Sequence, residues 1–333
     1  MPDQTMPTLH DIISARPHVN RFLKPTPLYH YATLSELVGA QVWIKHENHQ
    51  PIGAFKVRGG LNLAANLDLA ARRAGLFTAS TGNHGQSIAF AARAFGIKAT
   101  IAAPEGANPG KVAAMRGLGA KVVLHGSDFD AAREWIMDVA EEQGGHFIGP
   151  TDEPLIHGVG TYALEILETL PDVQTIIVPV GAGSGVCGTS IVAKSINPHI
   201  QVFGAQSSQA PAMQRSWQAG EMLTAPMHTF AEGIATRVPF ANTQRIMGHY
   251  LDDFLLASDE EIEQAIVLHL QHTHNLAEGA GAVALAVALK YKERLAGKKV
   301  VLVLSGGNLA LERLYQIFNK YGANLPTFSP IIR

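Results

Sequence analysis

Short, mostly apolar runs alternate with longer helix-like segments along the chain, and this alternation limits the possible folds more than any other feature. Runs with the length and composition of buried strands lie at 41–45, 76–79, 99–103, 121–124, 175–180, 201–205 and 300–304. Helical periodicity is found at 55–74, 86–95, 129–142, 154–170 and 260–273. Strands that alternate with helices predict parallel sheets covered by helices on both faces. With 333 residues, 47% of them hydrophobic, we expect one large or two closely packed α/β domains.

The composition excludes several classes of function. Lys and Arg together number 26 and Asp and Glu 28, so there is no basic excess for a nucleic-acid partner. Cys187 is the only cysteine, which excludes intramolecular disulfides and thiolate metal clusters and fits a reducing compartment. No apolar run reaches membrane-spanning length and the first residues do not resemble a signal peptide, so we expect a cytoplasmic protein without a membrane partner. The 15 histidines lack clustered acidic or cysteine partners, and we expect no metal site.

The stretch GAFKVRGG at 53–60 places one lysine, Lys56, between an aromatic residue and a glycine-rich helix start. Burial beside the ring of Phe55 would lower the pKa of the ammonium group, because burial disfavours the charged form. Such a lysine can form a Schiff base with a carbonyl compound or act as a base. The alternative is a surface lysine whose aliphatic stem lies across Phe55.

Three glycine- and hydroxyl-rich loops directly follow predicted strands, where open α/β sheets bind ligands. The first, STGNHGQ at 80–86, offers hydroxyls and backbone N–H groups that suit a carboxylate, with simple helix capping as the alternative. The second, GAGSGVCG at 181–188, can fold backbone N–H groups around a phosphate. The third, SGGN at 305–308, carries a serine that can meet a ring heteroatom or cap the last helix.

The second loop also contains a GxGxxG pattern, at Gly183, Gly185 and Gly188, which is found in dinucleotide-binding folds. Those folds carry an acidic residue about twenty positions further on, where it holds the ribose hydroxyls. That position is occupied here by Gln206, followed by two serines. A phosphate monoester is therefore a better match to this loop than a dinucleotide.

Taken together and in this order, the lysine stretch and the three loops resemble the fold-type II pyridoxal-phosphate enzymes, whose fold is similar to the tryptophan synthase beta subunit. The resemblance extends to 104–120 (PEGANPGKVAAMRGLGA) and 277–286 (AEGAGAVALA) and is strongest to the threonine and serine dehydratases (ammonia-lyases) and serine racemase. It implies two open parallel-sheet α/β domains with pyridoxal 5'-phosphate between them. Residues 1–73 and 149–333 would form the large cofactor-binding domain and 74–148 the small domain. We also expect a homodimer and no regulatory domain after Arg333.

The same resemblance implies a role for each motif. Lys56 would hold the cofactor as a Schiff base with Phe55 beside the ring, Asn83 would hydrogen-bond the ring oxygen, and Ser305 would face the pyridine nitrogen. Backbone amides from five consecutive residues would bind the phosphate: Gly181, Ala182, Gly183, Ser184 and Gly185. The carboxylate of the substrate would be bound by Ser80, Thr81, Asn83 and His84.

The activity that the resemblance implies is β-elimination from a 3-hydroxy amino acid such as L-threonine or L-serine, giving a 2-oxo acid and ammonia. A serine beside the pyridine nitrogen cannot keep it protonated as an aspartate would, so the cofactor is a weaker electron sink and fast elimination is favoured over transamination. Lys56 would then serve as both anchor and base. A non-catalytic ligand-binding protein is another possible class, but such a protein would have little reason to keep these motifs together.

Several alternatives stay open. Serine racemase uses a serine as its second acid or base where this chain has Thr81, so a racemase or a β-replacement enzyme is possible on the same cofactor. The substrate could also be 3-hydroxyaspartate or phenylserine, with a pocket lined by 149–152 and 232–237. Arg237 could pair with a second carboxylate or form a surface salt bridge. The divalent-cation site of many relatives has an acidic residue where this chain has Gln206, so we expect no divalent metal there, whereas a monovalent ion bound by carbonyls stays open.

Overall fold

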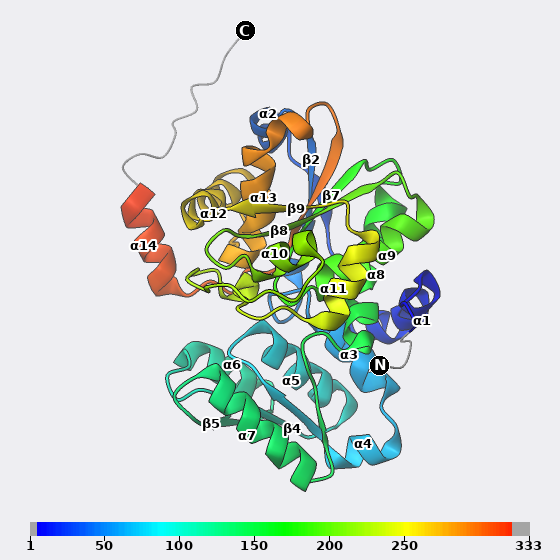
Figure 1. Ribbon diagram of the computed structural model, residues 1–333, viewed down its shortest axis with the longest axis vertical. Helices are drawn as coiled ribbons and strands as arrows, with labels where there is room; N and C mark the ends of the chain where they lie inside the picture. Colours follow the sequence, from blue (N-terminus) through cyan, green and yellow to red (C-terminus); the bar gives the residue numbers. More distant parts are fainter. Residues whose placement is uncertain (1–4, 322–333) are drawn as a thin grey trace.

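The computed structural model of the chain describes residues 5–321, which fold into two α/β domains stacked one above the other (Figure 1). The larger sheet has six strands in the order β1-β2-β10-β7-β8-β9, and the smaller has four in the order β5-β4-β3-β6. All neighbouring strands run parallel except β1 and β2. The expected fold class is thereby confirmed.

The larger sheet lies between two layers of helices. Its strands are β1 (Leu28–His30), β2 (Gln41–His46), β7 (Thr175–Pro179), β8 (Gln201–Ser207), β9 (Asp253–Ala257) and β10 (Lys299–Leu304). One face is covered by α2 (Ala32–Val38), α12 (Asp259–Thr273) and α13 (Gly279–Lys290), and α14 (Leu311–Tyr321) packs against α12. The other face is covered by α1 (Leu9–Asn20), α8 (Glu153–Thr169), α9 (Ser184–Ile196), α10 (Ala212–Ala219) and α11 (Ala241–Tyr250). Because both faces are buried, the central strands are almost continuously apolar.

The smaller sheet has the same arrangement. Its strands are β3 (Leu76–Ala79), β4 (Ala99–Ala103), β5 (Lys121–Leu124) and β6 (His146–Phe147). Helices α3 (Val57–Asn66), α5 (Asn83–Phe95) and α6 (Pro109–Gly117) cover one face, and α7 (Phe129–Glu142) covers the other. Short 3-10 turns are found at η1 (Glu47–His49), η2 (Glu232–Ile234) and η3 (Lys292–Arg294).

Each predicted strand is present, and β1, β6 and β9 are additional. The prediction of one helix over 55–74 is wrong, because the chain turns after α3 and a second helix, α4 (Leu69–Ala74), begins. The carboxylate of Asp68 accepts a hydrogen bond from the backbone N–H of Ala71 and so caps this new helix. Among residues 5–321, no helix is long and apolar enough to cross a membrane.

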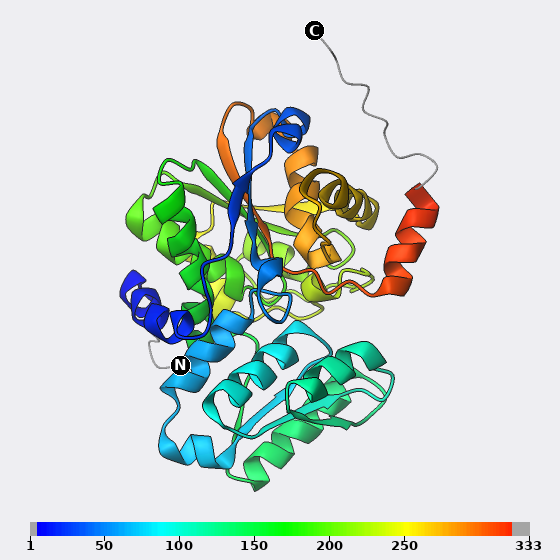
Figure 2. The same ribbon diagram turned by 180° about the vertical axis from the view of Figure 1, so that it is seen from behind.

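Helix α3 lies at the junction of the two domains, where it packs against both α5 and α8. Figure 2 shows this junction from behind, with α1 in dark blue beside it. A helix shared between both cores belongs fully to neither, so the boundaries at 73/74 and 148/149 stay a prediction. The position of α3 matters for function because Lys56 directly precedes it.

Candidate active site

The lysine stretch and the three strand-end loops meet between the two domains. The backbone N–H of Phe55 donates to the carbonyl of Ser305 at 3.0 Å, which joins the lysine stretch to the loop after β10. Asn308 Nδ2 donates to Asn83 Oδ1 at 2.7 Å, which joins that loop to the one after β3. A Cβ atom added at Gly185 would lie 3.5 Å from the ring of Phe55, so the loop after β7 reaches the same place. Four motifs spread over the chain therefore surround one site.

Lys56 is half-buried, and its Nζ lies 5.2 Å from the centroid of the Phe55 ring. Burial lowers the pKa of Lys56 to about 8, although the carboxylate of Glu278 opposes the shift. At pH 7, about a tenth of such an amine is neutral, compared with about 0.03% at the ordinary value of 10.5. The backbone of Lys56 is held by Ser87, whose Oγ donates to its carbonyl at 2.6 Å. This lysine combines a fixed position with a reactive amine.

Asn83 is fixed from two sides by residues to which the sequence analysis gave no role. Its Nδ2 donates to Glu278 Oε1 at 2.7 Å, and its Oδ1 accepts from Asn308. Asn308 also donates to the carbonyl of Ile52 at 2.8 Å, which ties it to the lysine stretch. Burial raises the pKa of Glu278. The one signal for Glu278 in the sequence is an acidic residue in the otherwise small and apolar segment 277–286.

The loop after β3 leads into α5. Ser80 is buried, and its Oγ accepts hydrogen bonds from the N–H groups of Gly82 at 3.1 Å and Gly85 at 2.9 Å, so Ser80 organises the turn. His84 is buried and its Nε2 lies 3.3 Å from the carbonyl of Ile148. Burial and the nearby ammonium of Lys56 lower the pKa of His84 to about 3, so the ring is neutral and can contribute a hydrogen bond but no charge. Thr81 is half-buried at the bend of this loop.

The loop after β7 has the features of a phosphate cradle. Gly183 has φ +103°, and a Cβ atom there would lie 2.8 Å from the Cβ of Thr243. A Cβ atom at Gly181 would lie 2.1 Å from the carbonyl oxygen of Gly233. Thr243 Oγ1 donates to the carbonyl of Ala182 at 2.7 Å and holds the loop in place. The loop ends at the N-terminus of α9, where free N–H groups and the helix dipole favour an anion.

Ser305 follows β10 directly and is buried, with 4% of its surface exposed. Helix α14 begins only at Leu311, so Ser305 does not cap it, and the capping alternative is wrong. A buried hydroxyl at the end of a central strand, beside Phe55, fits the ring nitrogen of a bound pyridine.

Gln206 and Arg237, for which the sequence left more than one role possible, both bind other residues of the chain. Gln206 is fully buried, and its Nε2 donates to Thr236 Oγ1 at 2.8 Å and to the carbonyl of Ile234 at 3.3 Å. Arg237 is exposed and forms an ion pair with Asp130 at 2.5 Å, so the surface salt bridge considered for it is present. In the described part of the chain, no group of three or more His, Cys, Asp or Glu side chains could hold a metal ion.

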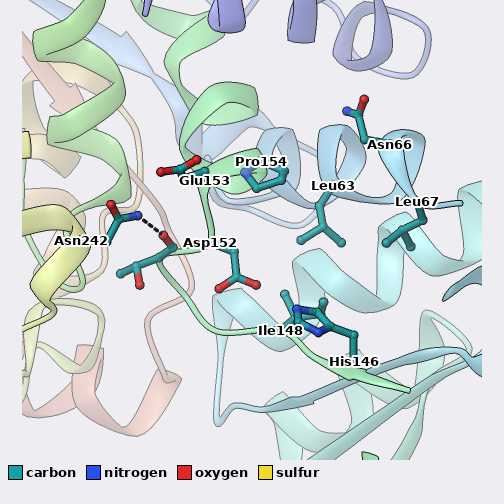
Figure 3. A pocket seen from close by; sticks show the side chains of 10 residues that line it. Leu63, Asn66, Leu67, His146, Ile148, Asp152, Glu153, Pro154 and Asn242 are labelled. Carbon is teal, nitrogen blue, oxygen red and sulfur yellow. Dashed lines mark hydrogen bonds between the residues drawn. The ribbon is translucent and has the colours of Figure 1, made fainter. Parts of the chain in front are cut away.

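A half-open cavity of about 520 Å³ lies where the chain crosses from the small sheet back to the large one (Figure 3). Of the segment 149–152, Thr151 and Asp152 line it, and Asn242 Nδ2 donates to the carbonyl of Thr151 at 3.0 Å. None of the residues predicted to bind the cofactor or the substrate carboxylate is among its lining: Leu63, Asn66, Leu67, His146, Ile148, Thr151, Asp152, Glu153, Pro154 and Asn242. It adjoins the loop after β3 through Ile148, whose carbonyl lies 3.3 Å from His84 Nε2.

Comparison with known proteins gives consistent results. The model of the family described as pyridoxal-phosphate dependent enzyme matches residues 19–306. An L-threonine ammonia-lyase of Thermotoga maritima is 40% identical over 317 residues, 95% of this chain and 79% of that protein. The catabolic L-threonine dehydratase TdcB of Escherichia coli K12 is 36% identical over 313 residues, 93% of this chain and 95% of that protein.

Solved structures agree with these relatives. The processed form of threonine deaminase isoform 2 from Solanum lycopersicum superposes with a TM-score of 0.89 at 29% identity and covers 96% of this chain and 95% of that one. Serine racemase from Dictyostelium discoideum superposes with a TM-score of 0.86 at 33% identity and covers 91% and 99%.

Proposed function

The chain belongs to the family of pyridoxal-phosphate dependent enzymes, and we propose that it is a deaminating dehydratase, a carbon–oxygen lyase of amino-acid metabolism. Its substrate would be L-threonine or L-serine, and its products a 2-oxo acid and ammonia. The observation that carries the proposal is Lys56, a half-buried amine of lowered pKa whose neighbour Phe55 lies against Gly185 of the glycine loop after β7. Relatives that are 36% to 40% identical to this chain carry the name of the same reaction.

The residues present fit pyridoxal phosphate, which, when bound, supplies an electron sink for charge that develops at the substrate Cα. Lys56 would hold the aldehyde end, and the amides of 181–185 at the N-terminus of α9 would hold the phosphate. Asn83, oriented by Glu278 and Asn308, would hydrogen-bond the ring oxygen. Ser305 would meet the ring nitrogen.

In the reaction itself, Lys56 would act as the base that removes the proton from the substrate Cα and holds it on Nζ. Its lowered pKa suits this role, because a general base works best when its pKa is near the working pH. The N–H groups at the start of α5, with Ser80, Thr81, Asn83 and His84, would bind the substrate carboxylate.

Two ion pairs between the helices of the smaller sheet and the segment 232–237 favour a substrate with an uncharged side chain. Lys111 pairs with Glu232 at 2.5 Å, and Arg237 pairs with Asp130 at 2.5 Å. A second carboxylate on the substrate, as in 3-hydroxyaspartate, would have to compete with Glu232 or Asp130 for Lys111 or Arg237. Threonine and serine need no such exchange.

Racemisation is the second candidate function, and Thr81 is the observation that favours it. Its hydroxyl lies half-buried in the loop that would bind the substrate, and serine racemase is among the structural relatives. Replacing Thr81 by Ala should spare elimination and remove any racemisation. Loss of both activities would contradict this role for Thr81.

We further propose that the protein is cytoplasmic and forms a homodimer, with the domain boundaries predicted above. The exposed apolar side chains Leu311, Tyr315 and Phe318 along α14 are consistent with self-association. Sedimentation velocity over a range of concentrations measures the oligomeric state.

The decisive experiment begins with purified protein and added pyridoxal phosphate. The wild type should acquire the visible absorption of lysine-bound pyridoxal phosphate, and Lys56→Ala should not. Release of 2-oxo acid from a panel of 3-hydroxy amino acids, with chiral analysis of the unreacted substrate, then separates lyase from racemase. A wild type that stays colourless would show that the proposal is wrong.

A further inference from the structure

Four charged side chains are buried together around Arg58. Lys45 of β2, Glu47 of η1, Arg58 of α3 and Glu165 of α8 have exposed fractions of 1%, 0%, 0% and 6%. Two are cationic and two anionic, so the cluster is balanced in charge. It joins three elements within residues 41–66 to the distant helix α8, and Arg58 lies only two residues after Lys56.

Arg58 is the centre of this charge cluster. Its Nε and Nη2 donate to the two oxygens of Glu47, both at 2.8 Å. Its Nη1 and Nη2 donate to the two oxygens of Glu165 at 2.6 and 2.9 Å, and Nη1 also donates to Thr161 Oγ1 at 3.2 Å. These bonds use all five N–H donors of the guanidinium group. Such a fork-to-fork arrangement fixes direction as well as distance.

Stability alone does not account for this cluster. Buried ion pairs lose the hydration of each charge, and well-packed apolar side chains in their place often give a protein of equal stability. What the ion pairs add to apolar packing is a set of directional bonds between the two helices. The cluster therefore indicates that the placement of α3 against α8 matters.

Helix α8 makes a second link, to the phosphate loop. Tyr162, one turn before Glu165, donates from its Oη to the carbonyl of Gly185 at 3.0 Å and accepts from Thr189 Oγ1 at 2.8 Å. The ring of Tyr162 also meets the ring of Phe55 edge-on, with centroids 6.3 Å apart. One side of α8 thus contacts both the segment that carries Lys56 and the loop that would hold the phosphate.

We propose that Arg58 and Glu165 are positioning residues that, through α8, set the distance between Lys56 and the phosphate loop. A ligand that carries both an aldehyde and a phosphate then meets Lys56 and the phosphate loop at once. Its phosphate binds the loop more strongly because the bond to Lys56 has already positioned the phosphate there. This role goes beyond the reaction proposed above, since it concerns the binding of the cofactor whichever reaction follows.

The test compares two ligands that differ only in the phosphate. Apoenzyme is titrated with pyridoxal and with pyridoxal 5'-phosphate, and the dissociation constants are measured from the visible absorption. In the wild type, the phosphate should strengthen binding greatly. In Glu165→Gln, we expect this phosphate advantage to fall by about tenfold or more, with the affinity for pyridoxal changed by less than about twofold.

The matched control is Glu168→Gln. Glu168 lies one turn further along α8 and forms a bidentate pair with Arg16 at 2.5 and 2.6 Å, but on the surface. The same chemical change there should leave the phosphate advantage at its wild-type value. A defect that is merely structural, or confined to Lys56, would weaken the binding of pyridoxal and of pyridoxal 5'-phosphate by the same factor.

A second variant covers the case in which Glu165→Gln does not fold. Tyr162→Phe removes a single oxygen at the other end of the link. The Thr189 hydroxyl, which lies 2.9 Å from the Gly185 carbonyl, can then donate its one proton to that carbonyl instead of to Tyr162. It should reduce the phosphate advantage several-fold without affecting pyridoxal. An unchanged ratio in folded Glu165→Gln, or in Tyr162→Phe when the first variant does not fold, would overturn the positioning role alone. A wild type that binds neither ligand would overturn the assignment of the cofactor as well.

Discussion

Gly183→Ala tests whether the loop after β7 must keep its observed path to bind a phosphate. Gly183 has φ +103°, outside the range that alanine adopts readily, and this conformation costs about 1–2 kcal/mol for a residue with a side chain. The new methyl group would also lie 2.8 Å from the Cβ and 2.9 Å from the Oγ1 of Thr243. Overpacking of this kind costs about 1–3 kcal/mol. We expect the loop to move rather than absorb both costs.

Movement of the loop would weaken the binding of pyridoxal phosphate in particular. Thr243 cannot move aside without losing the hydrogen bond that its hydroxyl donates to the carbonyl of Ala182. A hydrogen bond to a charged group contributes about 1.5–3 kcal/mol, so the loss of one amide contact to the phosphate would weaken binding about 10- to 150-fold. Spectroscopic titration of the apoenzyme measures the affinity, and thermal melting without cofactor measures the cost to the fold.

Gly119→Ala is the matched control for this change. Gly119 has a similar φ of +94°, but a Cβ atom there would meet nothing within 4 Å. This variant should lose about 1–2 kcal/mol of stability and bind the cofactor as the wild type does. If Gly183→Ala also bound pyridoxal phosphate with wild-type affinity, the argument that this loop cradles the phosphate would be refuted.

Three further predictions concern charge and hydrogen bonding. Burial lowers the pKa values of His84 and His269 to about 3, so below pH 6.5 these two residues bind protons in the unfolded chain but not in the folded protein. Each should therefore lower the free energy of unfolding by about 1.4 kcal/mol for every pH unit below 6.5. Urea unfolding between pH 6.5 and 4.5 should show that the free energy of unfolding of His269→Gln falls less steeply than that of the wild type. Labelling of Lys56 in the apoenzyme by pyridoxal and borohydride should rise with a midpoint near pH 8, and a midpoint above 10 would contradict the burial argument. Gln206→Glu replaces a donor by an acceptor beside the carbonyl of Ile234 and should cost about 1–3 kcal/mol in urea unfolding, whereas equal stability would show that this contact contributes nothing.

The parts of the molecule that follow from local chemistry were predictable from the sequence. Strands β7 and β10 are buried on both faces and are therefore apolar runs, which local pattern reveals. Strands β1 and β6 escaped prediction because one is a short and largely exposed edge strand and the other has only two residues. The glycines at 181–185 were recognisable because a tight cradle for an anion needs glycine.

Contacts between distant segments could not be predicted. Glu278 is 195 residues from Asn83, and Glu165 is 107 residues from Arg58, so no local pattern connects either pair. The histidines give a similar lesson, since His46 and His49 stack at 5.0 Å and the charge of His46 influences His269, far along the chain. In the sequence these residues lie in segments without any sign of a shared environment.

Burial drives the titratable groups around Lys56 toward their neutral forms. The pKa values of Lys56 and His84 are lowered and that of Glu278 is raised, in each case with burial as the largest cause. Two anions, a phosphate and a substrate carboxylate, would nevertheless have to bind here. The two loops proposed for them lead into α9 and α5, so backbone N–H groups and helix dipoles rather than cationic side chains would supply the attraction. Such dipoles cannot take up or lose a proton, so their attraction for the two anions would not change with pH.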